Sequence, residues 1–128
     1  MKAMTVKNEK LVLTDVEMPN VKDDEVRIKI KAIGINRADL LQKKGTYPSP
    51  KGWPEWPGLE VAGVVDAMGE TAKQKGRFKI GDSVCALLGG GGYAEYVAVK
   101  YDMLMPVPEN CTMEEAASIP EAYATSYL

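Results

Sequence analysis

The clearest pattern in this chain is an alternation of apolar and charged residues between positions 26 and 33. Apolar side chains occupy every second position, and cations occupy most of the positions between them. The apolar set is Val26, Ile28, Ile30 and Ala32, and the cationic set is Arg27, Lys29 and Lys31. Because side chains on a strand point alternately to opposite faces, this pattern predicts a half-buried strand of the antiparallel type. The cations are interpreted as its solvated face, with an anion-binding site as the alternative.

Further short strands are predicted where apolar residues alternate, or run together, between turn residues. They cover residues 1–7, 11–16, 59–68, 84–88, 93–99 and 104–107. Gly63 lies inside one of these segments, which indicates that another part of the backbone approaches closely there. Residues 69–76 are polar between two glycines and are interpreted as a loop.

Helix is predicted in only two parts of the chain. A short helix covers about 37–44, directly after the alternating strand. Near the C-terminus, Thr112 and Glu115 have the spacing of a capping box, which opens a helix. Pro120 suits the first turn of a second helix over residues 121–128. That pattern stops without a C-cap, so we expect the helix to belong to a longer chain.

Many short strands, turns rich in Gly and Pro, and little helix together predict a mainly β fold. A compact, partly open β-barrel fits this pattern better than a sandwich or a parallel sheet. Residues 1–111 are expected to form the barrel domain. Residues 112–128 are expected to begin a helical connection.

The segment from Tyr47 to Pro57 combines four prolines with Trp53 and Trp56. Proline at this density excludes a helix or a central strand and predicts an ordered loop. The tryptophan rings either cover one end of the barrel or contact a ligand, and the first interpretation is favoured.

The glycine run at 89–92 formally fits G-x-G-x-x-A, but a strand-like segment follows it instead of a helix, so we reject a dinucleotide fingerprint there.

Composition removes several classes of function. The net charge of −2 gives no sign of a nucleic-acid-binding or membrane-binding surface. No apolar run approaches the roughly 20 residues that cross a bilayer, and the N-terminus lacks a signal-peptide core, so we expect a cytoplasmic protein.

The chain has no histidine, which excludes a Ser-His or Cys-His nucleophile. Two cysteines without histidine do not make a zinc site, and Cys85 is predicted to be a buried thiol.

Candidate chemistry gathers where the alternating strand runs into the first helix. Gly34 and Asn36 follow the strand, Asp39 and Gln42 are polar positions of the helix, and Tyr47 follows on the rigid loop. Polar side chains at such a corner suit a small-molecule pocket. The alternative is an ordinary strand, helix and surface loop.

Several sequence blocks, in the order in which they occur, resemble the medium-chain dehydrogenase/reductase superfamily. The similarity is to its zinc-independent NADPH:quinone oxidoreductase branch, of the p53-inducible type. The blocks are GINRADLLQ (34–42), GTYP (45–48), PGLEVAGVV (57–65), GDSV (81–84), GGGYAEY (90–96) and AASIPEA (116–122). The resemblance covers nearly the whole chain and implies the GroES-like catalytic domain of that superfamily, without its nucleotide-binding Rossmann domain.

The resemblance also implies that no metal is used. In zinc-dependent relatives a cysteine and a histidine occupy the places that match Asn36 and Leu59, and the relatives' cysteine-rich zinc lobe has no counterpart here.

In zinc-free relatives, the residues matching Asn36 and Asp39 lie beside the nicotinamide of NADPH. The tyrosine matching Tyr47 reaches toward the quinone, and the threonine matching Thr125 contacts the nicotinamide. The resemblance therefore implies Asn36 and Tyr47 as catalytic residues, and Asn36, Asp39 and Thr125 as cofactor-binding residues. The cofactor carries the hydride chemistry, and the protein supplies position and hydrogen bonds. Asp39 has the alternative role of capping or orienting its helix.

We therefore expect the N-terminal part of an NADPH-dependent quinone oxidoreductase, with little NADPH affinity or turnover of its own. A solitary GroES-like module that binds a partner is one alternative. An enoyl or alkenal reductase of the same superfamily is another. Apolar surface around Tyr123, Tyr127 and Leu128 predicts a homo-oligomer.

Overall fold

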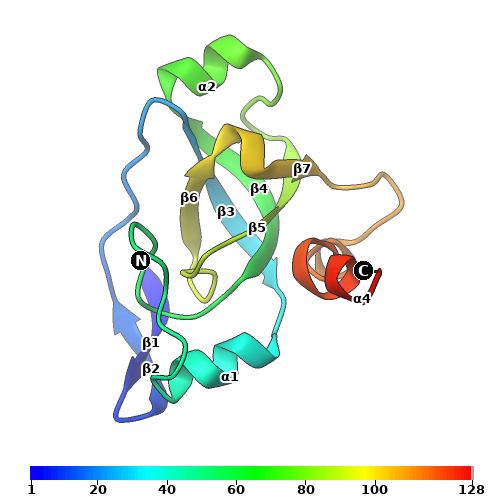
Figure 1. Ribbon diagram of the computed structural model, residues 1–128. Helices are drawn as coiled ribbons and strands as arrows, with labels where there is room; N and C mark the ends of the chain where they lie inside the picture. Colours follow the sequence, from blue (N-terminus) through cyan, green and yellow to red (C-terminus); the bar gives the residue numbers. More distant parts are fainter. Residues whose placement is uncertain (128) are drawn as a thin grey trace.

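The computed structural model of this chain describes residues 1–127, with side chains described through Ser126. Two antiparallel sheets make up the fold (Figure 1). A hairpin of β1 (Lys2–Lys7) and β2 (Lys10–Asp15) forms the first. The second has the strand order β6-β3-β4-β5-β7. Its strands are β3 (Glu25–Ile33), β4 (Glu60–Met68), β5 (Ser83–Leu87), β6 (Tyr96–Lys100) and β7 (Leu104–Pro106).

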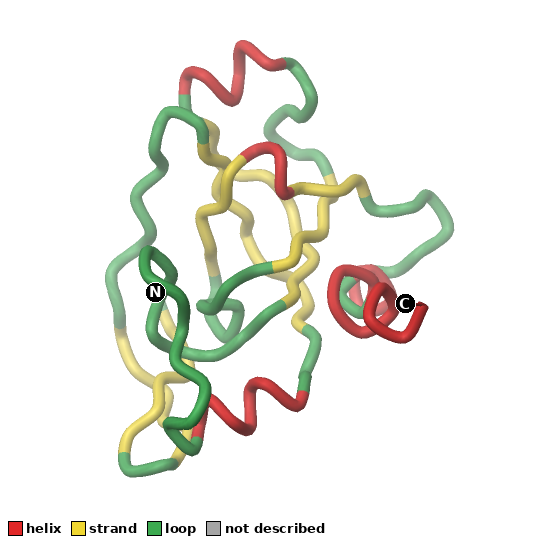
Figure 2. The backbone as a smooth tube through the Cα atoms, viewed as in Figure 1, coloured by secondary structure: helices red, strands yellow, loops and turns green. Residues whose placement is uncertain are grey.

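The sheets do not close on themselves, which confirms the mainly β, partly open architecture. In the strand order, β6 and β7 are the two edges of the large sheet. An isolated bridge between Ala3 and Ala94 links the hairpin to the segment that leads into β6. Figure 2 shows the long loops that connect the strands.

Burial along β3 follows the predicted alternation. Val26 and Ile28 are fully buried, whereas Lys29 and Lys31 are exposed. Arg27 departs from the prediction of a solvated cationic face, because its guanidinium pairs with Asp66 at 2.9 Å. The main core lies between the strands and consists of Val26, Ile28, Val61, Val65, Ala72, Val84, Ala86, Leu88, Val97, Val99 and Leu104.

Gly63 confirms the predicted close approach of two backbones. A Cβ atom at this position would collide with the carbonyl oxygen of Lys29 on the neighbouring strand. Cys85 is also buried as predicted, and burial raises the pKa of its thiol.

One prediction about the loops is wrong, because residues 69–76 contain a helix, α2 (Glu70–Lys75). Gly69 is its N-cap, and Gly76 ends it in the left-handed conformation with φ +67°. Glu70 in the first turn and Lys73 in the last turn complement the helix dipole. Gly76 at the C-terminal end and this order of charges indicate a helix. The prediction missed it because the two flanking glycines were interpreted as loop residues.

Helix α1 (Arg37–Lys43) follows β3 and confirms the first predicted helix. It lies at the opposite end of the large sheet from α2 (Figure 1). A short 3-10 helix (Tyr101–Met103) separates β6 from β7.

The C-terminal part begins with α3 (Met113–Ala116), which the predicted capping box opens. The hydroxyl of Thr112 accepts from the Glu115 backbone N–H at 3.1 Å, and the Glu115 carboxylate accepts from the Thr112 N–H at 2.9 Å. The second predicted helix begins earlier than expected, as a π-helix (Ile119–Tyr123), and continues as α4 (Ala124–Tyr127). Leu128 lies outside the described residues.

The tryptophans of the Pro-rich loop contact the glycine run and the core. The indole N–H of Trp56 donates to the Gly91 carbonyl at 3.0 Å. Trp53 packs against the main core and fills the space that a side chain at Gly89 would need. These contacts agree with an ordered loop packed on the barrel, and the choice between covering its end and contacting a ligand stays a prediction. Strand β6 follows the glycine run, so the rejection of a dinucleotide fingerprint is confirmed.

Candidate active site

The corner between β3 and α1 is shaped by one glycine and one buried carboxylate. The Gly34 N–H donates to the Glu60 carbonyl at 3.1 Å, which holds the end of β3 against the start of β4. A Cβ atom at Gly34 would occupy the space of the Glu60 side chain. Only glycine at position 34 therefore lets the Glu60 carboxylate pass beneath the corner toward α1.

Asn36 is the N-cap of α1, with an extended backbone. Its backbone N–H donates to the Asp39 carboxylate at 2.9 Å, the contact that anchors the first turn of the helix. Its side-chain oxygen faces the backbone N–H of Asp39, which completes the capping box, and its Nδ2 donates to Oε1 of Glu60 at 3.0 Å. The amide is thus fixed in place at the predicted site.

Asp39 is buried, with 3% of its surface exposed. Its Oδ2 also accepts a hydrogen bond of 2.7 Å from the Tyr93 hydroxyl, whereas Oδ1 has no hydrogen-bond partner among the described residues. Burial, and then the hydrogen bond to Asp39, raise the pKa of Tyr93 well above its usual value. These contacts support the role of orienting the helix for Asp39, and its contact with a cofactor stays a prediction.

Glu60 is a site residue that the sequence reasoning missed. Its side chain is among the largest fully buried ones, with only 1% of the residue exposed. Oε1 accepts from Asn36, and Oε2 accepts from the backbone N–H groups of Glu121 at 2.8 Å and Ala122 at 3.3 Å. The signal was available, because a single carboxylate inside the apolar run LEVAGVV has to find donors in the interior.

Through Glu60, the structure connects Asn36 with the helical segment that carries Thr125. The Thr125 hydroxyl is exposed and donates to the Glu121 carboxylate at 3.4 Å, one turn before it in the helix. Asn36 and Asp39 thus lie on one side of the buried Glu60 carboxylate, and the turn before Thr125 lies on the other.

Tyr47 is not joined to this group by any hydrogen bond. It follows the C-terminal end of α1 and is 44% exposed. Helix α1, which lies between Asn36 and Tyr47 in the chain, is about 10 Å long. Gln42, which is buried, ties α1 to the loop beyond Tyr47 by donating to Ser49 at 2.7 Å and to the Glu55 carbonyl at 2.8 Å. The position of Tyr47 relative to Asn36 is therefore set by α1 and by this loop.

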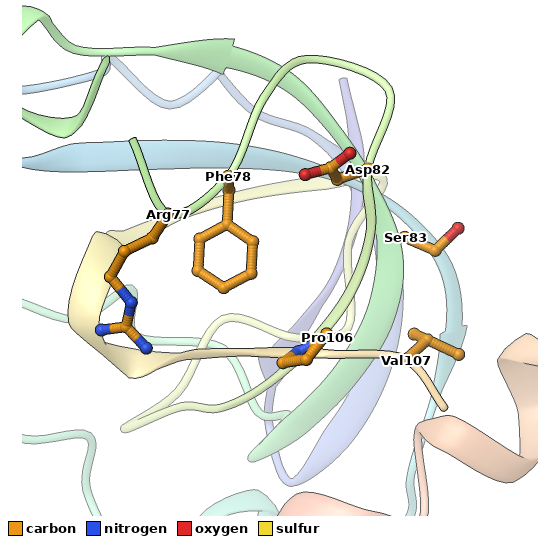
Figure 3. Close-up of a pocket in the computed structure, with 6 residues that line it drawn as sticks. All are labelled: Arg77, Phe78, Asp82, Ser83, Pro106 and Val107. Carbon is orange, nitrogen blue, oxygen red and sulfur yellow. The ribbon is translucent and has the colours of Figure 1, made fainter. Parts of the chain in front are cut away.

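Several hollows lie elsewhere, and none of the predicted site residues lines those found among the described residues. One, of about 510 Å³, is lined by Arg77, Phe78, Asp82, Ser83, Pro106 and Val107, and Figure 3 shows the Phe78 ring pointing into it. Another, of about 300 Å³, has Trp56 and Tyr96 in its wall. These two do not bring together polar groups comparable to those around Glu60, so the β3–α1 corner remains the candidate site.

No group of three or more Cys, Asp or Glu residues within positions 1–127 is arranged to hold a metal ion. None of the helices in this part of the chain is long and apolar enough to cross a membrane.

The chain matches the alcohol dehydrogenase GroES-like domain over residues 22–109. It is 38% identical over 116 residues to the quinone oxidoreductase of Sus scrofa, covering 90% of this chain and 34% of that protein. It is 34% identical over 118 residues to the synaptic vesicle membrane protein VAT-1 homolog-like of Mus musculus, covering 92% of this chain and 28% of that protein. The chain therefore spans about a third of the length of these relatives.

Solved structures show the same fold. A probable oxidoreductase from Mycobacterium abscessus superposes with a TM-score of 0.86 at 37% identity, covering 99% of this chain and 41% of that one. The quinone oxidoreductase from Thermus thermophilus, solved also as its complex with NADPH, superposes with a TM-score of 0.77 at 36% identity. That comparison covers 99% of this chain and 39% of the other.

Proposed function

The chain belongs to the alcohol dehydrogenase GroES-like domain family, and from this membership we propose that it is the catalytic-domain part of an NADPH-dependent quinone oxidoreductase. Relatives named quinone oxidoreductase match it along nearly its whole length, and one of them was solved with NADPH. We propose that the reaction needs no metal, because neither a thiolate nor an imidazole is present at Asn36 or Leu59.

The observation that carries the proposal is the arrangement of polar groups around Glu60. Asn36 is held from two sides, by Asp39 through its backbone and by Glu60 through its amide. The helical segment that carries Thr125 is held by the same carboxylate. Binding sites of this kind depend on a few polar groups fixed by the scaffold. A site formed by Asn36 and Thr125 has such fixed supports.

The residues present fit a nicotinamide cofactor. Asn36 keeps one amide N–H for a ligand, because only one N–H is used by Glu60. Thr125 is exposed and offers a hydroxyl. NADPH, when bound, supplies the hydride, and these two groups would bind and orient its carboxamide. We propose that the exposed hydroxyl of Tyr47 hydrogen-bonds to an oxygen of the quinone.

We expect the 128-residue chain alone to bind NADPH weakly and to turn over negligibly. The chain matches about a third of the length of its quinone oxidoreductase relatives. Family resemblance assigns most of the NADPH contacts to the nucleotide-binding part of such proteins, which this stretch does not match. Tight NADPH binding by the 128-residue chain in a calorimetric titration would contradict this expectation.

The function is tested on the native protein purified from its source, with NADPH and a para-benzoquinone as substrates. We expect NADPH oxidation that depends on the quinone, and we expect Asn36→Ala to lower kcat/KM by roughly tenfold or more, because a positioned hydrogen-bond donor is lost. Asn110→Ala, a change at an exposed turn, is the matched control and should leave activity unchanged.

Conjugated enones are assayed in parallel. Turnover of enones without turnover of quinones would replace the proposal by an enoyl or alkenal reductase. A native protein that reduces neither substrate would favour a binding module.

A further inference from the structure

We propose that Glu60 is the positioning residue of this site: its carboxylate determines which way the Asn36 amide faces and holds the Thr125-bearing segment against the barrel. The inference rests on the proposed function insofar as Asn36 and Thr125 contact the cofactor. The geometry of Glu60 itself does not depend on that function.

The first step is the burial of Glu60 without an ion pair. Across residues 1–127, no lysine or arginine side chain forms a salt bridge with it, and the two ion pairs found there are Lys2–Asp15 and Arg27–Asp66. A buried carboxylate is expensive unless its oxygens accept hydrogen bonds. Glu60 meets this requirement with three N–H donors, contributed by two separate segments of the chain. Removing the Asn36 donor leaves Oε1 unpaired, whereas Oε2 has two donors.

The second step concerns the orientation of the Asn36 amide. A carboxylate can only accept hydrogen bonds, so the NH₂ group of Asn36, and not its oxygen, has to face Glu60. The oxygen of the amide then faces the backbone N–H of Asp39, as in a capping box, and the second N–H is left for a ligand. Glu60 therefore selects the donor that a ligand meets at Asn36. If position 60 carried a donor, the amide would turn over and present the opposite groups.

The third step concerns the C-terminal segment. Pro120 is buried at the start of the π-helix and has no backbone N–H to donate. The next two N–H groups, of Glu121 and Ala122, both point at Oε2 of Glu60. Thr125 follows Glu121 by one turn and is hydrogen-bonded to its side chain. The same carboxylate therefore sets the positions of Asn36 and of the segment that carries Thr125.

Gly34 makes room for the Glu60 side chain at the corner between β3 and α1. A side chain at position 34 would occupy the space of the Glu60 carboxyl group. The glycine leaves that space open.

Glu60→Gln tests the proposal, because it keeps the size of the side chain and replaces one acceptor oxygen by a donor. If the remaining oxygen stays with the backbone N–H groups of Glu121 and Ala122, the new NH₂ group faces the NH₂ group of Asn36. We expect the Asn36 amide to turn over. Asp66→Asn is the matched control, since it removes a carboxylate from the same strand, where the partner is Arg27 and not Asn36.

The first readout is nitrogen-15 NMR of the 128-residue chain, which needs no activity. In Glu60→Gln we expect the side-chain amide signals of Asn36 to shift and its protons to exchange faster with water. In Asp66→Asn we expect the Asn36 signals to stay where they are. Unchanged Asn36 signals in Glu60→Gln would overturn the inference.

The second readout is the kinetics of the native protein. We expect Glu60→Gln to lower kcat/KM for NADPH by about tenfold, because a misplaced binding group costs at least that much. We expect Asp66→Asn to lower it less than twofold. Wild-type kinetics in Glu60→Gln, alongside shifted Asn36 signals, would overturn the positioning role.

A double variant separates positioning from simple structural support. Asn36→Asp combined with Glu60→Gln restores a donor–acceptor pair with its direction reversed, so we expect the protection of the Glu121 and Ala122 amides to match that of the wild type. Activity should stay low, because position 36 then presents only acceptors. Recovery of activity together with protection would show that Glu60 acts only as a structural support.

The failure of this inference can be told from the failure of the proposed function. A native protein without reductase activity overturns the proposed function, and with it the role of Glu60 in the reaction. The NMR result still decides whether Glu60 orients Asn36 and the C-terminal segment. With an active native protein, the outcomes that contradict this inference leave the proposed function standing.

Discussion

Tyr93 and Asp39 form a buried pair that shows how much a single residue contributes at this site. The Tyr93 hydroxyl donates to Oδ2 of Asp39 at 2.7 Å, and the other Asp39 oxygen has no partner among the described residues. Asp39 in turn anchors the N–H of Asn36. Loss of the Tyr93 hydroxyl would therefore remove a hydrogen-bond donor from a carboxylate that already has one unpaired oxygen. It would also loosen the start of α1.

We predict that Tyr93→Phe lowers the free energy of unfolding by about 1–3 kcal/mol. This is the usual cost of leaving a buried polar group without its hydrogen-bond partner. Urea denaturation followed by circular dichroism measures this difference. Tyr101→Phe is the control, because the Tyr101 hydroxyl makes no hydrogen bond to any residue in the described part of the chain. Equal effects of the two changes would contradict the prediction.

The pKa of Tyr93 predicts a dependence of stability on alkaline pH. Burial and the Asp39 carboxylate favour the protonated phenol, so the pKa is higher in the folded chain than its ordinary value near 10 in the unfolded chain. This stabilisation is fully present below pH 10 and is lost as pH rises toward the folded-state pKa. Denaturation of the wild type and of Tyr93→Phe at about pH 8 and about pH 11 tests it. The difference in free energy of unfolding between the two proteins should be smaller at the higher pH.

At the scale of the element, α2 shows how capping decides between a loop and a helix. Six polar and small residues, ETAKQK, lie between two glycines, and only Ala72 among them is buried. The helix ends where Gly76 adopts φ +67°. Its backbone N–H then donates to the Lys73 carbonyl, which satisfies one of the last groups of the helix.

We predict that Gly76→Ala destabilises the protein by about 1 kcal/mol, because a Cβ atom disfavours the left-handed conformation. No atom lies within 4 Å of the place where the Cβ would be, so crowding does not contribute. Gly76→Asn should cost less, since asparagine tolerates this conformation. Thermal denaturation of the two variants gives the order, and a larger loss for asparagine than for alanine would refute this account.

At the scale of the whole molecule, the C-terminal segment presents apolar surface beside the barrel. Tyr123 is 63% exposed, while the side chain of Tyr127 and all of Leu128 lie outside the described part of the chain. Figure 1 shows this segment beside the large sheet, where it makes the contacts to Glu60.

We predict that the chain self-associates through this segment, because exposed apolar surface tends to be buried between copies. Light scattering at increasing concentration measures the mass, and Tyr123→Lys should shift it toward the monomer. Lys29→Ala, at an exposed position on β3, should leave it unchanged. A wild-type monomer at high concentration would count against this prediction.

Local sequence patterns were sufficient for most of the elements. The alternation in β3 and the capping box of Thr112 and Glu115 act between residues a few positions apart, so they can be interpreted without the fold. For the same reason, the short helix predicted at about 37–44 and the open, mainly β architecture followed from periodicity, glycine and proline. The placement of Asn36 at the start of α1 also followed.

The connections of the site depended on the tertiary structure. Glu60 meets Asn36 across 24 positions of sequence and Glu121 across 61, and Tyr93 meets Asp39 across 54. Such hydrogen bonds form only after the strand register has brought the end of β3, the start of β4 and the C-terminal segment together. A lone glutamate in an apolar strand shows that donors are needed but does not identify them. Their identity is set by the packing of distant segments, because burial makes each donor necessary while the fold alone determines which ones are within reach.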